Sequence, residues 1–272
     1  TVEGSTYPLT TTEPPMTTSP PTAANPRRRR LMIGGGILAV VVIAAGVGLW
    51  WFFRDDAPAE VDLATAVEQV APSGEDAPEG AAAGDVDIAG AWAVDTSIGD
   101  FDFETATGSF AGFRVEEELS TIGSTTAVGR TGVVAGTLQI DGTTLASAEI
   151  SADLSQITTN DSRRDSRARG ALDTDQFPEA TFVLTEPVDF GAAAADGEAV
   201  QVAAVGDLTI KGVTQSVEFP LEAQLVEGTI VVVGSLDVTF SDFDVTVPSA
   251  PIVVSVDDEG VLELQLLFTK AA

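Results

Sequence analysis

The stretch "GTIVVVGSLDVTF", residues 228–240, carries the pattern that decides the fold. One face of this segment is apolar and holds Ile230, Val232, Leu236, Val238 and Phe240. The other face is polar and holds Thr229, Ser235, Asp237 and Thr239. Alternation with a period of two residues predicts a β-strand that is buried on one side and exposed to water on the other.

The same alternation continues in both directions from this stretch. It is strict in "TQSVEFPLEAQL" (214–225), "VLELQLLF" (261–268), "ASAEISADL" (146–154) and "VVAGTLQI" (133–140), and looser in "TFVLTEPVDF" (181–190) and "VQVAAVGDLTI" (200–210). Turn signals such as Asp141–Gly142 and Glu227–Gly228 separate the strands. About eight strands of this kind predict an all-β fold, an antiparallel, lipocalin-like, up-and-down β-barrel.

Small residues recur among the large ones on the expected inner face of this barrel. They are Gly136, Ala148, Ala152, Ala204, Gly206, Ala223 and Gly234. Small residues on an inner face either allow close packing in a filled core or leave a tunnel for a ligand, and the spacing alone does not decide between the two.

The composition excludes several classes of function. The chain has no cysteine and no histidine, so it can form neither a disulfide nor a Ser-His or Cys-His catalytic arrangement. Its formal net charge of −29 argues against a nucleic-acid partner, because phosphate binding needs a basic face. The short acidic runs 173–175 and 242–244 are expected to be solvated turns, so no metal site and no cofactor are predicted.

The N-terminal part is organised differently from the strands. Residues 1–30 are rich in Thr and Pro, end in Arg27–Arg30 and are expected to be disordered. Residues 31–53 carry no charge and are long enough to cross a bilayer as a helix, which predicts a single-pass transmembrane anchor. The preceding arginines place the N-terminus in the cytoplasm and the C-terminal domain outside it. A cleaved signal peptide is the alternative.

Residues 54–89 are rich in Ala, Pro, Gly and acidic residues. We expect a flexible linker with a reach of roughly 30–35 Å, in which residues 58–71 form a short helix.

The segment "NDSRRDSRARG", residues 160–170, gathers four arginines in an acidic chain. A residue of the run 160–162 is a suitable N-cap and Gly170 a suitable C-terminal residue, so a helix of about two turns is predicted at one end of the barrel. Its arginines have two interpretations. They pair with nearby carboxylates such as Asp165 and Asp173, or they border the barrel mouth and hold a polar or phosphate headgroup.

A second charged pair is predicted inside the barrel. Glu117 shares the parity of Phe113 and Val115, and Arg130 shares the parity of Val134. Unless a bulge intervenes, both charges face the apolar side, where an unpaired charge is very costly. We therefore expect Glu117 and Arg130 to meet, either as a structural bridge or as a polar point that fixes a ligand head.

Several of these segments together resemble the YceI-like family of bacterial lipocalin-like proteins that bind polyisoprenoids. The matching segments are Ser162–Phe182, Gly206–Ala223, Val128–Gly142, Gly234–Ser249 and Gly90–Asp95. The resemblance implies an antiparallel barrel whose tunnel binds a long isoprenoid chain, with no catalytic mechanism attached to the fold. Many family members carry histidines near the region that matches 98–115, and this chain has none.

The resemblance covers residues 90–272 and, with the inward parity, suggests which residues contact a ligand. The candidates for the tunnel wall and mouth are Phe113, Val115, Glu117, Arg130, Val134, Leu138, Ile150, Leu154, Arg163, Arg167, Leu172, Phe177, Phe182, Leu208, Ile210, Phe219, Leu221, Ile230, Val232, Leu236, Phe240, Phe243, Leu264 and Leu266.

Three functions remain open from the sequence. The first is a membrane-anchored, extracytoplasmic lipid-binding protein, not an enzyme, that holds an isoprenoid such as a quinone or a polyprenyl compound. The second is a cell-envelope interaction module with a filled core and no ligand. The third is a hydrolase of envelope lipids with an Asp- or Ser-only site. The sequence does not indicate an oligomeric state.

Overall fold

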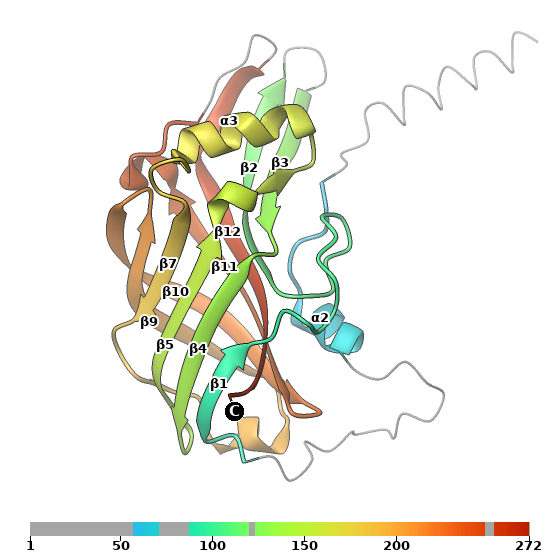
Figure 1. Ribbon diagram of the computed structural model, residues 1–272, viewed down its shortest axis with the longest axis vertical. Coiled ribbons are helices and arrows are strands. Elements are labelled where there is room, and N and C mark those ends of the chain that lie inside the picture. Colours follow the sequence, from blue (N-terminus) through green and yellow to red (C-terminus); the bar gives the residue numbers. More distant parts are fainter. Residues whose placement is uncertain (1–56, 71–86, 120–122, 248–252, 272) are drawn as a thin grey trace, which may run out of the picture. The chain divides into compact units, whose positions relative to one another are not determined.

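The structure is a computed structural model that describes residues 57–70, 87–119, 123–247 and 253–271 (Figure 1). Its strands are β1 (Gly90–Val94), β2 (Phe110–Leu119), β3 (Gly123–Thr131), β4 (Val134–Asp141), β5 (Thr144–Asp153), β6 (Thr158–Thr159), β7 (Glu179–Leu184), β8 (Val188–Asp189), β9 (Val200–Ile210), β10 (Val213–Val226), β11 (Thr229–Thr239) and β12 (Val253–Lys270). Its α-helices are α2 (Leu63–Val70) and α3 (Ser162–Leu172), and its 3₁₀ helices are η1 (Leu154–Gln156), η2 (Ala192–Asp196) and η3 (Phe240–Phe243).

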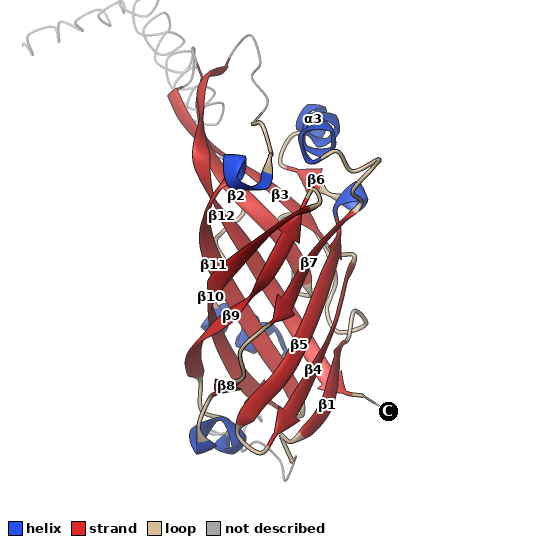
Figure 2. Cartoon of the chain, turned by 90° about the vertical axis from the view of Figure 1, so that its left-hand side faces the viewer, coloured by secondary structure: helices blue, strands red, loops and turns tan. Residues whose placement is uncertain are grey.

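Eight strands close into a barrel (Figure 2). Their order is β1-β4-β5-β7-β9-β10-β11-β12, and β1 pairs with β12 to complete the ring. All of these pairings are antiparallel. The predicted antiparallel barrel of about eight strands is confirmed.

Two positions in the barrel are each filled by a pair of shorter strands with a break between them. β1 and β2 lie along the same edge of β12, separated by the loop of residues 95–109. β3 pairs with β2 and β4 pairs with β1, with a break only at residues 132–133. If each interrupted strand is counted once, successive strands are neighbours, which is the up-and-down order that the turn signals predict.

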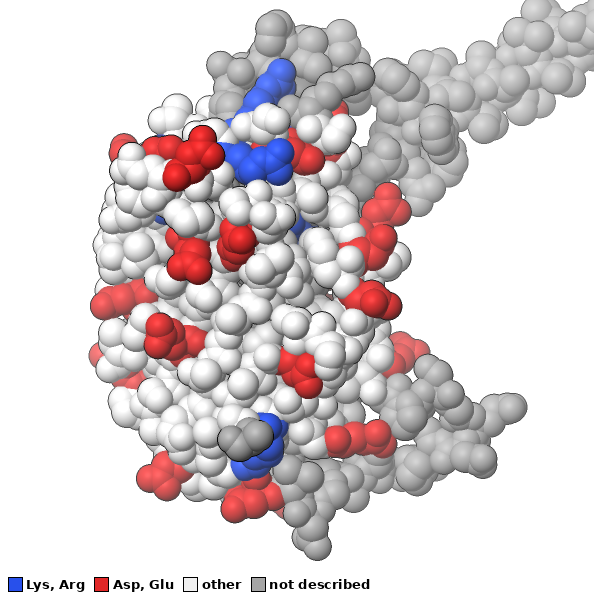
Figure 3. Space-filling model, viewed as in Figure 1, with Lys and Arg blue, Asp and Glu red and all other residues white. Residues whose placement is uncertain are grey.

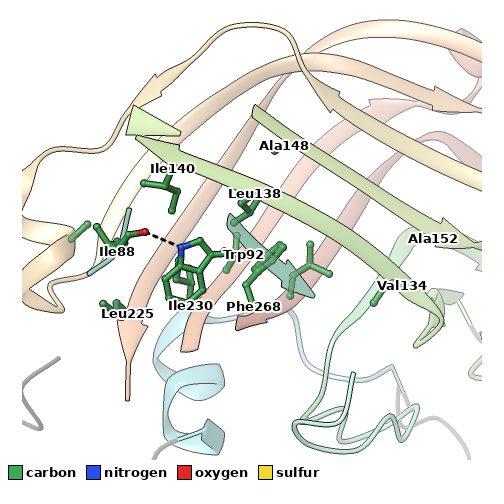
Figure 4. Packing of buried hydrophobic residues seen from close by; sticks show 13 residues of the cluster. Ile88, Trp92, Val134, Leu138, Ile140, Ala148, Ala152, Leu225, Ile230 and Phe268 are labelled. Carbon is green, nitrogen blue, oxygen red and sulfur yellow. Dashed lines mark hydrogen bonds between the residues drawn. The ribbon is translucent and has the colours of Figure 1, made fainter. Parts of the chain in front are cut away.

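The main core lies inside the barrel, around the tryptophan of β1 (Figure 4). Trp92 is fully buried, and its indole Nε1 donates a hydrogen bond to the Ile88 carbonyl at 2.8 Å. Leu138, Ile230 and Phe268 pack in the same cluster. These residues come from β1, β4, β11 and β12, so the cluster joins the two sides of the barrel's closing seam.

A second apolar cluster lies on the outside of the barrel. Val231 and Val233 of β11 and Leu267 of β12 have outward parity, yet all three are buried under Leu63 and Ala66 of α2. Asp62 caps this helix by accepting a hydrogen bond from the Thr65 amide at 2.8 Å. That amide and the Thr65 hydroxyl lower the pKa of Asp62, so the capping carboxylate stays charged at neutral pH.

The linker prediction is therefore wrong for residues 57–70. The predicted helix exists but begins at Leu63 rather than near Pro58, and it is docked on the barrel. The physical reason is the outward-facing apolar patch of β11 and β12, which α2 removes from water. The compact unit accordingly begins at Asp55.

Replacing Ala66 with Asp is expected to undock α2. Ala66 is 1% exposed against β11 and β12, so an aspartate there would bury an unpaired charge. We expect the free energy of unfolding to fall by about 1–3 kcal/mol and amide exchange in 57–70 to become fast. Ala64→Asp places the same charge on the exposed side of the helix and serves as the control. Equal exchange in the two variants would show that α2 does not need this contact.

The predicted arginine-rich helix is present as α3, which crosses one end of the barrel (Figures 1 and 2). Its end differs from the prediction. The helix continues through Gly170 to Leu172, and Asp173, with φ of 51°, takes the left-handed conformation that ends it. Asp173 and Thr174 satisfy carbonyls of the last turn, so Gly170 is not needed as a terminal residue.

Residues 31–53, the expected membrane anchor, lie outside the described residues. Within the described part of the chain, no helix combines the length and the apolar character that crossing a membrane requires.

Candidate functional site: two apolar chambers in the barrel

The first chamber lies inside the end of the barrel that carries η2. It is a cavity of ≈ 130 Å³, and almost all of the side chains around it are apolar. Leu138 and Ala148 line it from β4 and β5, Ala204 and Leu221 from β9 and β10, and Ala194 of η2 closes over it. We call it the η2 chamber.

The second chamber lies toward α3. It has a volume of ≈ 110 Å³ and is lined by Phe113 of β2, Leu172 of α3, Leu208 of β9, and Phe240 and Phe243 of η3. Both η1 and η3 contribute side chains, because each follows the end of a strand and folds over the rim. We call it the α3 chamber.

The two chambers meet at a ring of four side chains. Ile150, Phe182, Phe219 and Leu264 line both cavities. The rings of Phe182 and Phe219 stand edge to face, with centroids 6.1 Å apart and an interplanar angle of 82°. We call these four residues the waist. The barrel interior therefore holds two largely apolar chambers with these four side chains between them.

Most of the candidate ligand residues line one of the two chambers. These residues are Phe113, Leu138, Ile150, Leu154, Leu172, Phe182, Leu208, Ile210, Phe219, Leu221, Ile230, Val232, Phe240, Phe243, Leu264 and Leu266. These residues border a cavity inside the barrel, and their role as a ligand-binding wall stays a prediction.

The remaining candidates do not line a chamber. Val134 is packed in the main core and Leu236 against the cluster near η3. Phe177 lies over Gly212, and Val115 is buried and borders a separate, more polar pocket. Arg167 is exposed on α3, and the side chain of Arg163 is not among those the structure describes.

The predicted contact between Glu117 and Arg130 is wrong. Arg130 instead pairs with Glu263, its Nε lying 2.6 Å from Oε1, and Arg114 pairs with the other oxygen of Glu263 at 2.8 Å. Glu117 pairs with Arg164 of α3 at 2.8 Å. We call Arg114, Arg130 and Glu263 the charge cluster.

The charge cluster lies on the outer wall of the barrel. The strand break at residues 132–133 reverses the parity, so Arg130 faces outward although Val134 faces inward. The guanidinium groups also donate to main-chain carbonyls, Arg114 to Pro58 and Ala59, and Arg130 to Ala59. The segment before α2 therefore covers the charges. In addition, the guanidinium carbon of Arg130 lies 4.5 Å from the centroid of the Phe110 ring.

A sequence model of the YceI-like domain matches residues 92–268. The chain belongs to the YceI-like family. This match covers most of the segment, 90–272, that the sequence motifs indicated, and the barrel described above is the YceI-like domain of this protein.

The solved structures that this chain is similar to are distant from it in sequence. A polyisoprenoid-binding domain from Saccharophagus degradans, described as implicated in plant cell wall breakdown, is 19% identical, with a TM-score of 0.50, and the match covers 66% of this chain and 98% of that domain. BcnA of Burkholderia cenocepacia is 22% identical, with a TM-score of 0.44 and coverage of 58% and 94%. A YCEI protein of Campylobacter jejuni is 16% identical, with a TM-score of 0.41 and coverage of 53% and 85%. No curated protein matches the sequence.

Helix α3 of the YceI-like domain commits two of its arginines to contacts within the protein. Arg164 binds Glu117 and the side chain of Asn160, and Arg169 donates to the Ile157 carbonyl at 3.1 Å. Asp165, a predicted partner of Arg169, instead accepts hydrogen bonds from Thr159. Basic side chains still gather where α3 crosses the barrel end, on a face that is otherwise dotted with acidic ones (Figure 3). A headgroup role for α3 stays a prediction.

The carboxylates of the YceI-like domain form no metal-binding group in the part of the chain that the structure describes. Among those residues, no group of three or more Asp and Glu side chains could hold a metal ion. Besides Asp62, Asp95 and Asp102 have lowered pKa values, caused mainly by the Ser97 hydroxyl and by the Glu104 amide. Both are turn-forming carboxylates, so the shifts reflect local turns.

Proposed function

We propose that this protein is anchored in a membrane and holds an isoprenoid chain in the interior of its extracytoplasmic barrel. The observation that carries the proposal is the pair of largely apolar chambers that the waist separates inside the barrel. Most of the side chains around them are apolar, so the interior offers a hydrocarbon chain an apolar surface to contact. Membership of the YceI-like family supports the same class of ligand, as does the shared fold of the polyisoprenoid-binding domain from Saccharophagus degradans.

Burial of the chain supplies the affinity. Each buried carbon contributes about 0.8 kcal/mol, so one isoprene unit of five carbons contributes about 4 kcal/mol. A dry apolar cavity of about 150 Å³ accepts a molecule the size of benzene. Each chamber, at ≈ 130 and ≈ 110 Å³, therefore offers room for about one isoprene unit before any side chain moves.

Lipid extraction tests this proposal. The full chain, purified from membranes in mild detergent, is extracted with organic solvent and the extract is analysed by mass spectrometry. We expect an isoprenoid in a molar ratio near one to one, and none with a detergent-purified single-pass membrane protein used as the control. A protein that carries no isoprenoid, and that takes none up when quinones or polyprenols are supplied, would favour the ligand-free envelope module.

A further inference from the structure

The waist residues rest on glycines of the barrel wall. A Cβ added to Gly206 would lie 2.5 Å from the Phe182 ring, and one added to Gly136 would lie 2.4 Å from Ile150 Cδ1. A Cβ added to Gly234 would lie 2.5 Å from Leu221 Cδ2 and 2.9 Å from the Phe219 ring. Side chains therefore occupy the space that a wall Cβ would fill.

Backbone conformation does not explain these three glycines. Gly136, Gly206 and Gly234 lie in the middle of β4, β9 and β11, and none of them has a positive φ. Glycine in a strand interior is otherwise unfavourable, because it packs no side chain and is flexible in the unfolded chain. At these positions the missing side chain of glycine leaves a space in which a large inward side chain packs against the barrel wall.

A ring seated on glycine cannot retreat further from the tunnel axis. Phe219 is 5% exposed and packs edge to face against Phe182 on the same side of the barrel, because β7 and β10 both pair with β9. Both rings line both chambers, so a chain that occupies the two chambers has to displace them along the axis. A ligand confined to one chamber leaves them in place. The waist therefore separates short from long ligands.

We propose that Phe182 and Phe219, seated on Gly206 and Gly234, form an aromatic gate that sets how the barrel discriminates isoprenoids by chain length. This inference rests on the proposed function. Ligands of about one isoprene unit bind within a single chamber, and their binding is independent of the gate. Longer isoprenoids bind only when the two rings rotate out of the waist, so the gate limits the rate at which they enter.

The test compares two soluble probes on the full chain in detergent. Prenol, the five-carbon alcohol, fits one chamber, whereas farnesol, with fifteen carbons, needs both. The chain has no cysteine, so Ala148→Cys in the η2 chamber and Ala180→Cys in the α3 chamber each introduce a single thiol. Protection of that thiol from a small uncharged alkylating reagent reports how fast each probe arrives in each chamber.

We expect the double variant F182L/F219L to bring farnesol about ten times faster than in the wild type into whichever chamber farnesol reaches second. The arrival rate of prenol should stay unchanged. The matched control is F101L/F103L, because Phe101 and Phe103 lie in the loop of residues 95–109 and line neither chamber. The control should leave the ratio of farnesol to prenol rates as in the wild type.

A third variant, Gly206→Ala, works in the opposite direction, because its Cβ would lie 2.5 Å from the Phe182 ring and would push that ring toward the tunnel axis, which should slow farnesol but not prenol. It also keeps the test decisive if F182L/F219L does not fold. Equal farnesol-to-prenol ratios in the folded gate variants and the control would overturn the gate while leaving isoprenoid binding intact. A wild-type protein in which neither probe protects either thiol would overturn the proposed function, and the gate with it.

Discussion

Replacing Glu263 with Gln is expected to lower the free energy of unfolding of the barrel by about 3–5 kcal/mol. Glu263 is 2% exposed and receives hydrogen bonds from both Arg114 and Arg130. An amide keeps the shape but removes the charge, which leaves two buried guanidinium groups without a counter-ion. Chemical denaturation of the unit that begins at Asp55 measures the loss, and amide exchange in residues 57–60 should rise with it.

Glu259→Gln is the matched control for this variant. Glu259 lies on the same strand but is exposed, so its loss should change stability by less than about 0.5 kcal/mol. Replacing Arg114, Arg130 and Glu263 together with Met should be less harmful than Glu263→Gln alone, because no charge is then left unpaired. If Glu263→Gln is as stable as Glu259→Gln, the charge cluster does not contribute to the stability of the barrel.

The second large effect is expected from Ala204→Phe. Ala204 is 1% exposed, lines the η2 chamber and pairs in register with Phe219. An added benzene-sized group fills a cavity of ≈ 130 Å³. Loss of one isoprene unit's burial, about 4 kcal/mol, corresponds to a drop in isoprenoid affinity of about 100–1000-fold.

Ala203→Phe provides the comparison for this prediction. Ala203 precedes Ala204 on β9 but points outward and is exposed. Its replacement should leave both the affinity and the amount of co-purified lipid unchanged. Overpacking should lower the free energy of unfolding of Ala204→Phe by about 1–3 kcal/mol. A folded Ala204→Phe protein with wild-type affinity would mean that the ligand does not enter the η2 chamber.

The barrel was predictable from the sequence because the alternation of polar and apolar residues is a local signal. In β10 and β11 every inward residue can be read directly from parity, and most chamber-lining residues, such as Leu138, Phe219 and Leu264, follow from it. Parity holds only as long as a strand is continuous. The break at residues 132–133 therefore led to the wrong partner for Arg130, and Glu263 and Arg114 were missed as outward residues.

The contacts of the outer wall could not be read from the strands alone. Val231 and Val233 alternate with the inward residues Ile230 and Val232, and such a run of four apolar residues has no visible outward face. This run was the available sign that a further element covers β11, and α2 is that element. Phe190 and Ala194 were missed for a related reason, because they lie in a loop that folds over the end of the η2 chamber.

The packing of the waist side chains on these glycines also could not be predicted from the sequence. The small inward residues predicted either a tunnel or a filled core, and the structure shows that Gly206 and Gly234 instead receive Phe182 and Phe219. Which ring meets which glycine depends on the register between strands. In β7 and β9, for example, Phe182 pairs with Leu208 and lies diagonally from Gly206. That register is a property of the closed barrel.

The central claim is that the isoprenoid chain lies inside the barrel, and photo-crosslinking tests it most directly. A polyprenol that carries a diazirine near its tail end is bound to the full chain, irradiated, and the modified residues are identified by peptide mass spectrometry. The account predicts labels on inward residues of β5, β9 and β10, such as Ile150, Leu208 and Leu221, and their loss when unlabelled polyprenol competes. Labels confined to exposed apolar residues of the outer surface, such as Phe101, Val133 and Val183, would contradict it.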